Sequence, residues 1–152
     1  EDASLFKFIA NILEGDKERR ILLILNLIEN SRNAKLIPYL RNLLNHPSDD
    51  IKIQVLQMLP NFDYADFTKE VEPLVHDNTF EIRTAAIHYL FRKSRNGQQV
   101  LESLFNDSSN DVRTAVLMVA AHHYSHDKDF RRRLPFVQYF NTLIKEPEQS
   151  RG

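Results

Sequence analysis

Three stretches of the chain, residues 43–52, 74–83 and 104–113, repeat one pattern at offsets of 31 and 30 residues. In each stretch, two apolar residues are followed by a short polar turn, a hydroxyl residue, an acid, a β-branched apolar residue and a base. A weaker copy runs over residues 12–23, where two registers one residue apart fit the pattern. A repeat of this period is typical of stacked arrays in which no single unit can bury its own apolar face.

Each period holds two helical patterns of apolar residues and no strand pattern. The connections between these patterns are short and rich in Asn, Asp, Ser and Gly, as tight turns between helices require. Helices are therefore predicted near residues 3–14, 17–30, 34–45, 49–59, 65–76, 80–93, 98–106, 110–124 and 129–145.

The second helix of each pair has recognisable start chemistry. A hydroxyl side chain that can cap free backbone N–H groups precedes the helix at Ser48, Thr79 and Ser109. An acid occupies the first turn, where the helix dipole favours negative charge, at Asp50, Glu81 and Asp111. These two signals predict where three of the helices begin.

The repeated residues resemble HEAT repeats, in particular the short bacterial-type HEAT-like repeats also found in phycobilisome lyases. That family has a first helix often bearing Pro, an Asp-rich turn, and "Val-Arg-x-Ala-Ala" opening the second helix. Residues 82–86 and 112–116 match the second-helix motif, and Pro38, Pro73 and Pro135 match the proline position. The unit at residues 51–55 departs from the motif, with Lys in place of Arg and no Ala pair. The resemblance covers roughly residues 12–145.

Together, the repeat period and the family resemblance predict an all-α fold. The resemblance implies that this fold is a right-handed α-α superhelix of the ARM/HEAT type. About four helical hairpins and a terminal helix are expected, in a single HEAT-like repeat domain over residues 1–152. Because the chain opens with Glu1-Asp2 and without Met, we expect it to be a segment excised from a longer protein.

A base recurs once per unit, close after the acid, at Lys52, Arg83 and Arg113. We predict that these bases and the three first-turn acids form an inter-repeat ladder, in which each base meets the acid or the turn carbonyls of the adjacent unit. The alternative is a charge that is simply solvated at the surface.

Composition excludes several classes of protein. The 20 Lys and Arg against 21 Asp and Glu give a net charge of −1, which exerts no general pull on nucleic acid or anionic lipid. Without Cys there is no disulfide framework and no thiolate chemistry, so a cytoplasmic location is predicted. No apolar run is long enough to span a membrane. Because the chain has no nucleophile elbow and no phosphate-binding glycine loop, we expect a protein that is not an enzyme and has no cofactor.

His122, His123 and His126 form the densest cluster of metal-capable side chains in the sequence. His122 and His126 share a helix face, the spacing that can hold a divalent ion, but the spacing suggests no third ligand. We interpret the cluster as a polar helix end and predict no metal site. The basic run at residues 131–133 lies beside acids at 127 and 129 and is interpreted as a solvated helix start.

The opposite side of the second helices from the predicted core carries a mostly uncharged row. Second helices of HEAT-like arrays line the concave side, so the resemblance implies a partner-binding row on that face. Its predicted members are Ile53, Gln57, Thr84, His88, Phe91, Thr114 and Met118. An uncharged, partly apolar row suits the docking of a peptide or a partner helix. The alternative is that Phe91 and Met118 pack against neighbouring units.

The predicted function is a non-catalytic protein-interaction scaffold that uses this concave face. Its partner is a protein, a peptide or another domain of the parent chain. The alternative, which rests on architecture alone, is a cytosolic regulatory appendage of a bacterial membrane transporter resembling ADP/ATP (nucleotide) translocases.

Overall fold

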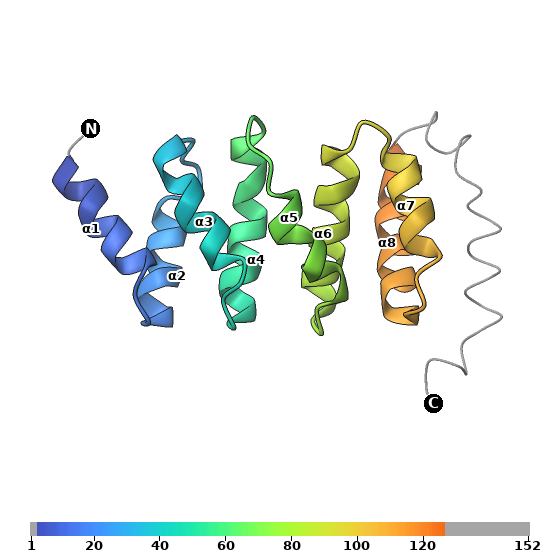
Figure 1. Ribbon diagram of the computed structural model, residues 1–152, viewed down its shortest axis with the longest axis horizontal. Helices are drawn as coiled ribbons and strands as arrows, with labels where there is room; N and C mark the ends of the chain where they lie inside the picture. Colours follow the sequence, from blue (N-terminus) through green and yellow to red (C-terminus); the bar gives the residue numbers. More distant parts are fainter. Residues whose placement is uncertain (1–2, 127–152) are drawn as a thin grey trace. The chain divides into compact units, whose positions relative to one another are not determined.

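The computed structural model describes residues 3–126, and every regular element within them is helical (Figure 1). The prediction of an all-α fold is therefore confirmed. The helix predicted for residues 129–145 and the basic run at 131–133 lie outside the described residues. The elements are α1 (Ala3–Leu13), α2 (Glu18–Leu27), η1 (Ala34–Leu36), α3 (Ile37–Leu43), α4 (Asp49–Met58), η2 (Leu59–Phe62), α5 (Thr68–Val71), η3 (Glu72–His76), α6 (Phe80–Lys93), α7 (Gly97–Phe105) and α8 (Asn110–His126).

Several predicted helices differ in detail from those that form, and in two of them proline explains part of the difference. The helix predicted for residues 65–76 begins only at Thr68, whose N–H donates to Asp66 Oδ1 at 2.9 Å and so closes a turn before the helix. It then tightens into the 3₁₀ helix η3, because Pro73 has no N–H to continue the α-helical hydrogen bonds. Likewise α4 ends at Met58 and the 3₁₀ helix η2 follows, with Pro60 in its first turn.

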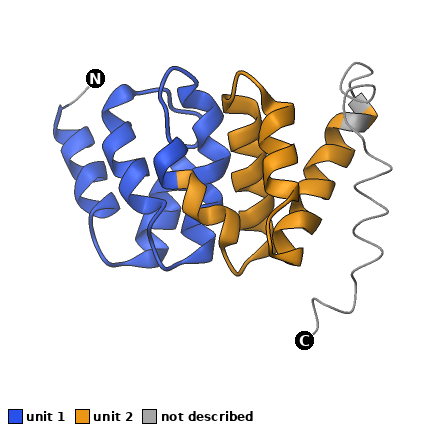
Figure 2. Cartoon of the chain, turned by 45° about the vertical axis from the view of Figure 1, so that its right-hand side comes forward, with its two compact units in different colours: residues 1–70 blue, residues 71–152 orange. Residues whose placement is uncertain are grey.

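The chain divides into two compact units, residues 1–70 and residues 71–152 (Figure 2). We describe each unit by itself, and a single domain over residues 1–152 stays a prediction.

In the first unit, α2 packs against α1 and α4, and α3 packs against α1 and α4. Ser48 Oγ donates to Glu18 Oε1 at 2.7 Å, and Asn61 Nδ2 donates to the carbonyl of Glu29 at 2.6 Å. These pairs are 30 and 32 residues apart, so they join successive hairpins in the register of the sequence period. The deeply buried side chains of this core include Ile21, Leu25, Leu40, Leu44, Ile51, Val55, Phe62 and Phe67.

In the second unit, α6 packs against η3, α7 and α8, and α7 packs against α8. Ala86 and Ala115 are fully buried, as expected for small residues that let neighbouring helices approach closely. His76 Nε2 lies 3.0 Å from Asp107 Oδ2, a contact between positions 31 residues apart. The core of this unit includes Ile82, Ala86, Ile87, Leu101, Phe105, Val112, Ala115 and Val116.

The turn before each second helix uses the same chemistry in all three repeats. A side chain two residues before the capping residue accepts that residue's N–H, at His46 Nδ1, Asp77 Oδ1 and Asp107 Oδ1. The predicted caps form at Ser48, whose Oγ accepts the N–H of Ile51, and at Ser109, whose Oγ accepts the N–H of Val112. The Thr79 side chain makes no capping hydrogen bond, so that prediction was wrong.

Candidate functional site

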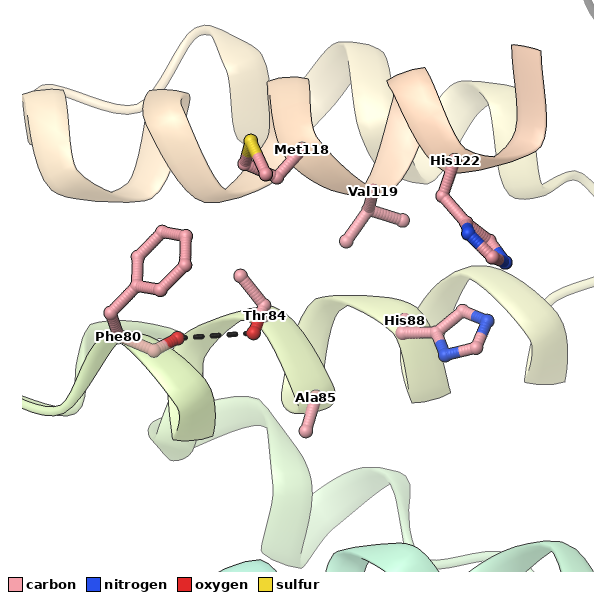
Figure 3. A pocket seen from close by; sticks show the side chains of 7 residues that line it. All are labelled: Phe80, Thr84, Ala85, His88, Met118, Val119 and His122. Carbon is pink, nitrogen blue, oxygen red and sulfur yellow. Dashed lines mark hydrogen bonds between the residues drawn. The ribbon is translucent and has the colours of Figure 1, made fainter. Parts of the chain in front are cut away.

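A groove of about 360 Å³ runs between α6 and α8, the two second helices of the second unit (Figure 3). Its lining is mostly apolar, and the hydroxyl of Thr84 is already used by the carbonyls of Phe80 and Glu81, at 3.1 and 3.0 Å. The groove therefore offers apolar surface with little free hydrogen-bonding capacity outside its imidazoles. The residues that line it are Phe80, Thr84, Ala85 and His88 from α6, and Met118, Val119 and His122 from α8.

One end of the groove exposes large apolar side chains to solvent. Met118 is 55% exposed and Phe80 is 41% exposed. The Phe80 ring also lies 5.6 Å from the Arg83 guanidinium, measured from the ring centre. Apolar side chains clustered around a concave surface are typical of binding sites.

The other end of the groove is lined by imidazoles. The ring centroids of His88 and His122 are 6.2 Å apart across the two helices, and His123 lies 5.3 Å from His88. Burial lowers the pKa of His88 below its usual value of 6.5, and the charges of Arg92 and then His122 lower this pKa further. The neutral form of His88 is therefore favoured, and its buried Nε2 has no hydrogen-bond partner among the described residues.

The structure brings together part of the predicted partner-binding row. Thr84, His88 and Met118 all line the groove. Thr114 does not line it, and its hydroxyl donates to the carbonyl of Asn110 at 2.8 Å. On α4 in the first unit, Ile53 is half-buried and Gln57 is exposed. Partner binding by these residues stays a prediction.

Phe91 of the same row is held by packing within the second unit. Its ring centroid lies 4.4 Å from that of His123. A Cβ added at Gly97 would lie 2.6 Å from two carbons of the Phe91 ring, so the start of α7 passes directly against this side chain. These contacts agree with the alternative interpretation, in which Phe91 is a packing residue.

Sequence reasoning missed several exposed or groove-lining residues on the second helices of each unit. Phe80 and His122 line the groove, although Phe80 occupies a position where another repeat has Asp49. In the first unit, Leu23 and Leu27 are 59% and 70% exposed on α2.

The burial pattern settles the register of the first repeat, which the sequence left open by one residue. Ile21 and Leu25 are completely buried, as are Ile51 and Val55 thirty residues later. With this register, Leu23 is equivalent to Ile53, so the predicted row has members on α2 as well. The signal that could have found them is this pair of buried positions four residues apart.

The predicted ladder residues make contacts inside their own repeats. Arg83 is 8% exposed, and its Nη1 donates to the carbonyls of Asp77 and Asn78, each at 3.0 Å, in the turn before its own helix. Arg113 Nη1 donates to the carbonyl of Asp107 at 2.7 Å in the equivalent turn.

The third base of the predicted ladder, Lys52, has its Nζ 3.7 Å from Asp49 Oδ1. The predicted acids Asp50, Glu81 and Asp111 are exposed in the first turns of α4, α6 and α8. A ladder from one repeat to the next stays a prediction.

The structure describes only part of the histidine cluster for which no metal site was predicted. Among residues 3–126, no group of three or more His, Cys, Asp or Glu is arranged to hold a metal ion. His122 lines the groove, whereas the side chain of His126 lies outside the described part of the chain.

The architecture of consecutive helical hairpins, joined by contacts at the sequence period, defines the class of α-solenoids. A family model described as HEAT repeats matches residues 37–121, more than half of the chain. The chain belongs to the HEAT-repeat family. No curated protein and no solved structure matches it, so the likeness to phycobilisome lyases stays a prediction.

Membership of this family supports a coarse statement of function. HEAT repeats commonly serve as protein-interaction scaffolds and are generally not catalytic. No helix in the described part of the chain has the length and apolar character needed to cross a membrane.

Proposed function

We propose that this chain is a non-catalytic protein-interaction scaffold that binds a protein or peptide partner on the exposed face of its second helices. The observation that carries the proposal is the groove between α6 and α8, where Met118 and Phe80 stay exposed at one end of an apolar surface. Burying such side chains against a partner removes apolar area from water, which favours association.

Two further features support partner binding on the second helices. In the first unit, Leu23 and Leu27 are the exposed equivalents of Ile53 and Gln57, so exposed apolar residues recur on second helices. The side chains that line the groove also come from regular helices, which hold them in fixed positions without a partner and so reduce the entropy lost on binding. We place the partner on the concave face, in keeping with the family.

The test compares two variants that make the same chemical change at similar exposure. Met118→Glu places a charge in the groove, and Leu5→Glu, where the leucine is 57% exposed on α1, is the matched control. Each protein is immobilised and used to capture proteins from a lysate of the organism that encodes it, with quantification by mass spectrometry. Circular dichroism checks that both variants fold.

We expect one set of captured proteins to be lost with Met118→Glu and retained with Leu5→Glu and the wild type. Equal capture by all three proteins would count against the groove as the binding surface.

A further inference from the structure

We propose that Asn96 is a site of spontaneous covalent modification, at which the side-chain amide is converted to aspartate and isoaspartate in the folded protein. The conversion needs no enzyme and no cofactor, and water and its hydroxide ion are the only co-reactants. It takes place at the start of α7 and does not depend on a partner in the groove, so it goes beyond the proposed function.

The sequence singles out this residue. Asn96 is the one asparagine of the chain that is followed by glycine. A backbone nitrogen can attack the side-chain carbonyl of a preceding asparagine, and glycine hinders this attack least because it has no Cβ. Asn96 is also exposed, so water and hydroxide reach it.

Packing explains why the glycine is there. A Cβ on Gly97 would lie 2.6 Å from two carbons of the Phe91 ring and 2.8 Å from the Phe91 carbonyl oxygen. The φ angle of Gly97 is not positive, so this close approach, and not an unusual backbone conformation, excludes a side chain. The fold therefore places an unhindered nitrogen directly after Asn96.

Capping explains why the asparagine is there. Asn96 is the N-cap of α7, and its Oδ1 accepts the N–H of Gln99 at 3.2 Å. Asparagine is among the most favourable residues at this position. The two structural requirements fall on adjacent residues, so the start of α7, which packs against α6, is also a reactive dipeptide.

The hydrogen bonds of this dipeptide leave the reaction open. The Gly97 N–H is the first of α7 and has no carbonyl partner within the helix, so the attacking nitrogen gives up no helical hydrogen bond. The Asn96 side chain gives up its bond to the Gln99 N–H, which lies at an exposed helix end, where local opening costs little. The fold therefore adds only the opening of one turn to the barrier.

The reaction has two steps. Hydroxide removes the amide proton of Gly97, the nitrogen bonds to Cγ of Asn96, and the Cγ–Nδ2 bond breaks, so that the side-chain nitrogen takes a proton from water and leaves as ammonia. Water then opens the resulting cyclic imide. Attack at Cγ gives aspartate, and attack at the main-chain carbonyl carbon gives isoaspartate, in which the backbone runs through Cβ and Cγ. Either product carries one more negative charge than asparagine.

The two products act differently on the start of α7. Aspartate still accepts the Gln99 N–H, and its charge is favoured at a helix N-terminus. Isoaspartate lengthens the backbone before Gly97, so it displaces the cap and the contact of Gly97 with Phe91. Because the Phe91 ring centroid also lies 4.4 Å from that of His123, isoaspartate disturbs the packing of α6, α7 and α8 together.

The test incubates the full chain at 37 °C and pH 8.5, where hydroxide promotes loss of the amide proton, and in parallel at pH 6. Cleavage after glutamate gives a peptide of residues 82–102, whose single asparagine is Asn96. Mass spectrometry follows the mass gain of deamidation, and an isoaspartyl methyltransferase with a labelled methyl donor measures isoaspartate. Asn30, which is exposed and precedes a serine, is the internal control.

We expect Asn96 to gain mass before Asn30, and to do so faster at pH 8.5 than at pH 6. Asn96→Ser keeps a capping oxygen and removes the reactive amide, so its 82–102 peptide should show no gain. The incubated wild type should contain a fraction that melts about 2–8 °C lower, because isoaspartate displaces the cap. Asn96→Asp represents the other product and should melt as the fresh wild type does.

Two results would overturn the modification site. In one, Asn30 gains mass before Asn96, and in the other, the 82–102 peptide gains mass only after the chain is unfolded in urea. An incubated wild type that contains isoaspartate at position 96 and still melts as Asn96→Asp does would overturn the displacement of α7. The proposed function is tested separately, by the capture of partners with Met118→Glu.

Discussion

Arg83 offers the sharpest test of how a repeat of this chain is held together. It is the base of the second-helix motif, it is 8% exposed, and its Nη1 donates to two turn carbonyls at 3.0 Å. Its guanidinium also lies 5.6 Å from the centre of the Phe80 ring, while its buried Nε has no hydrogen-bond partner. Replacing Arg83 by Met keeps an apolar stem in place and removes the donors.

The expected loss follows from these contacts. Hydrogen bonds from a charged donor contribute about 1.5–3 kcal/mol each, so two of them represent about 3–6 kcal/mol before any compensation. The variant also removes the cost of a buried, unpaired Nε, about 1–3 kcal/mol, and water can reach the exposed Asn78. We therefore expect Arg83→Met to lower the free energy of unfolding by about 2 kcal/mol.

Thermal and urea denaturation of the wild type and the variant measure this loss, which corresponds to a melting temperature about 4–8 °C lower. Arg95→Met is the matched control, because Arg95 is exposed and its replacement should change stability by less than about 0.5 kcal/mol.

A double-mutant cycle of Arg83→Met with Asp111→Asn should show coupling below about 0.5 kcal/mol, since the described bonds of Arg83 stay in its own turn. An Arg83→Met protein as stable as the Arg95→Met control would refute the reasoning. Strong coupling to Asp111 would instead favour the ladder between repeats.

Two other predictions concern the packing around the groove. Gly97→Ala should destabilise the protein by about 1–3 kcal/mol in urea denaturation, because the new Cβ would meet the Phe91 ring at 2.6 Å and its carbonyl oxygen at 2.8 Å; a variant with a raised melting temperature would contradict this. Stability should also fall as pH is lowered from 7.5 to 5.5. Because the pKa of His88 is lowered in the folded protein, the unfolded chain binds a proton at this residue more readily than the folded chain does. The stability that is present above pH 6.5 is therefore lost as pH falls, and the melting temperature of His88→Gln should depend less on pH.

The sequence predicts the helices well because their signals are local. The period places three second helices, and Ser48 and Ser109 cap them as their position suggests. The errors in the helices also have local causes. Asp66 delays the helix predicted to start at residue 65, and Pro73 converts its second half into a 3₁₀ helix.

The candidate site is only partly predictable from the sequence, because the exposure of a side chain depends on where the following helix packs. Phe91 lies on the predicted face of α6, but the connection to α7 is so short that Gly97 comes back against it. Helical geometry alone cannot show this, since it describes one helix at a time. Conversely, Phe80 is apolar at a helix start and reads as a core residue, yet it remains 41% exposed.

The same physics indicates where specificity can reside in this array. Within the second unit, the positions that stack one helix on the next stay small or aliphatic, as Ala86 and the equivalent Val116 do, because both are completely buried. Two residues further along each helix the equivalent pair is His88 and Met118, an imidazole against a thioether. Packing fixes the first pair and leaves the second free to differ, so each helix can bring a different side chain to the groove without disturbing the stack. On the proposed function, a partner that distinguishes this protein from other solenoids would contact His88 and Met118, and not only the geometry that the repeats share.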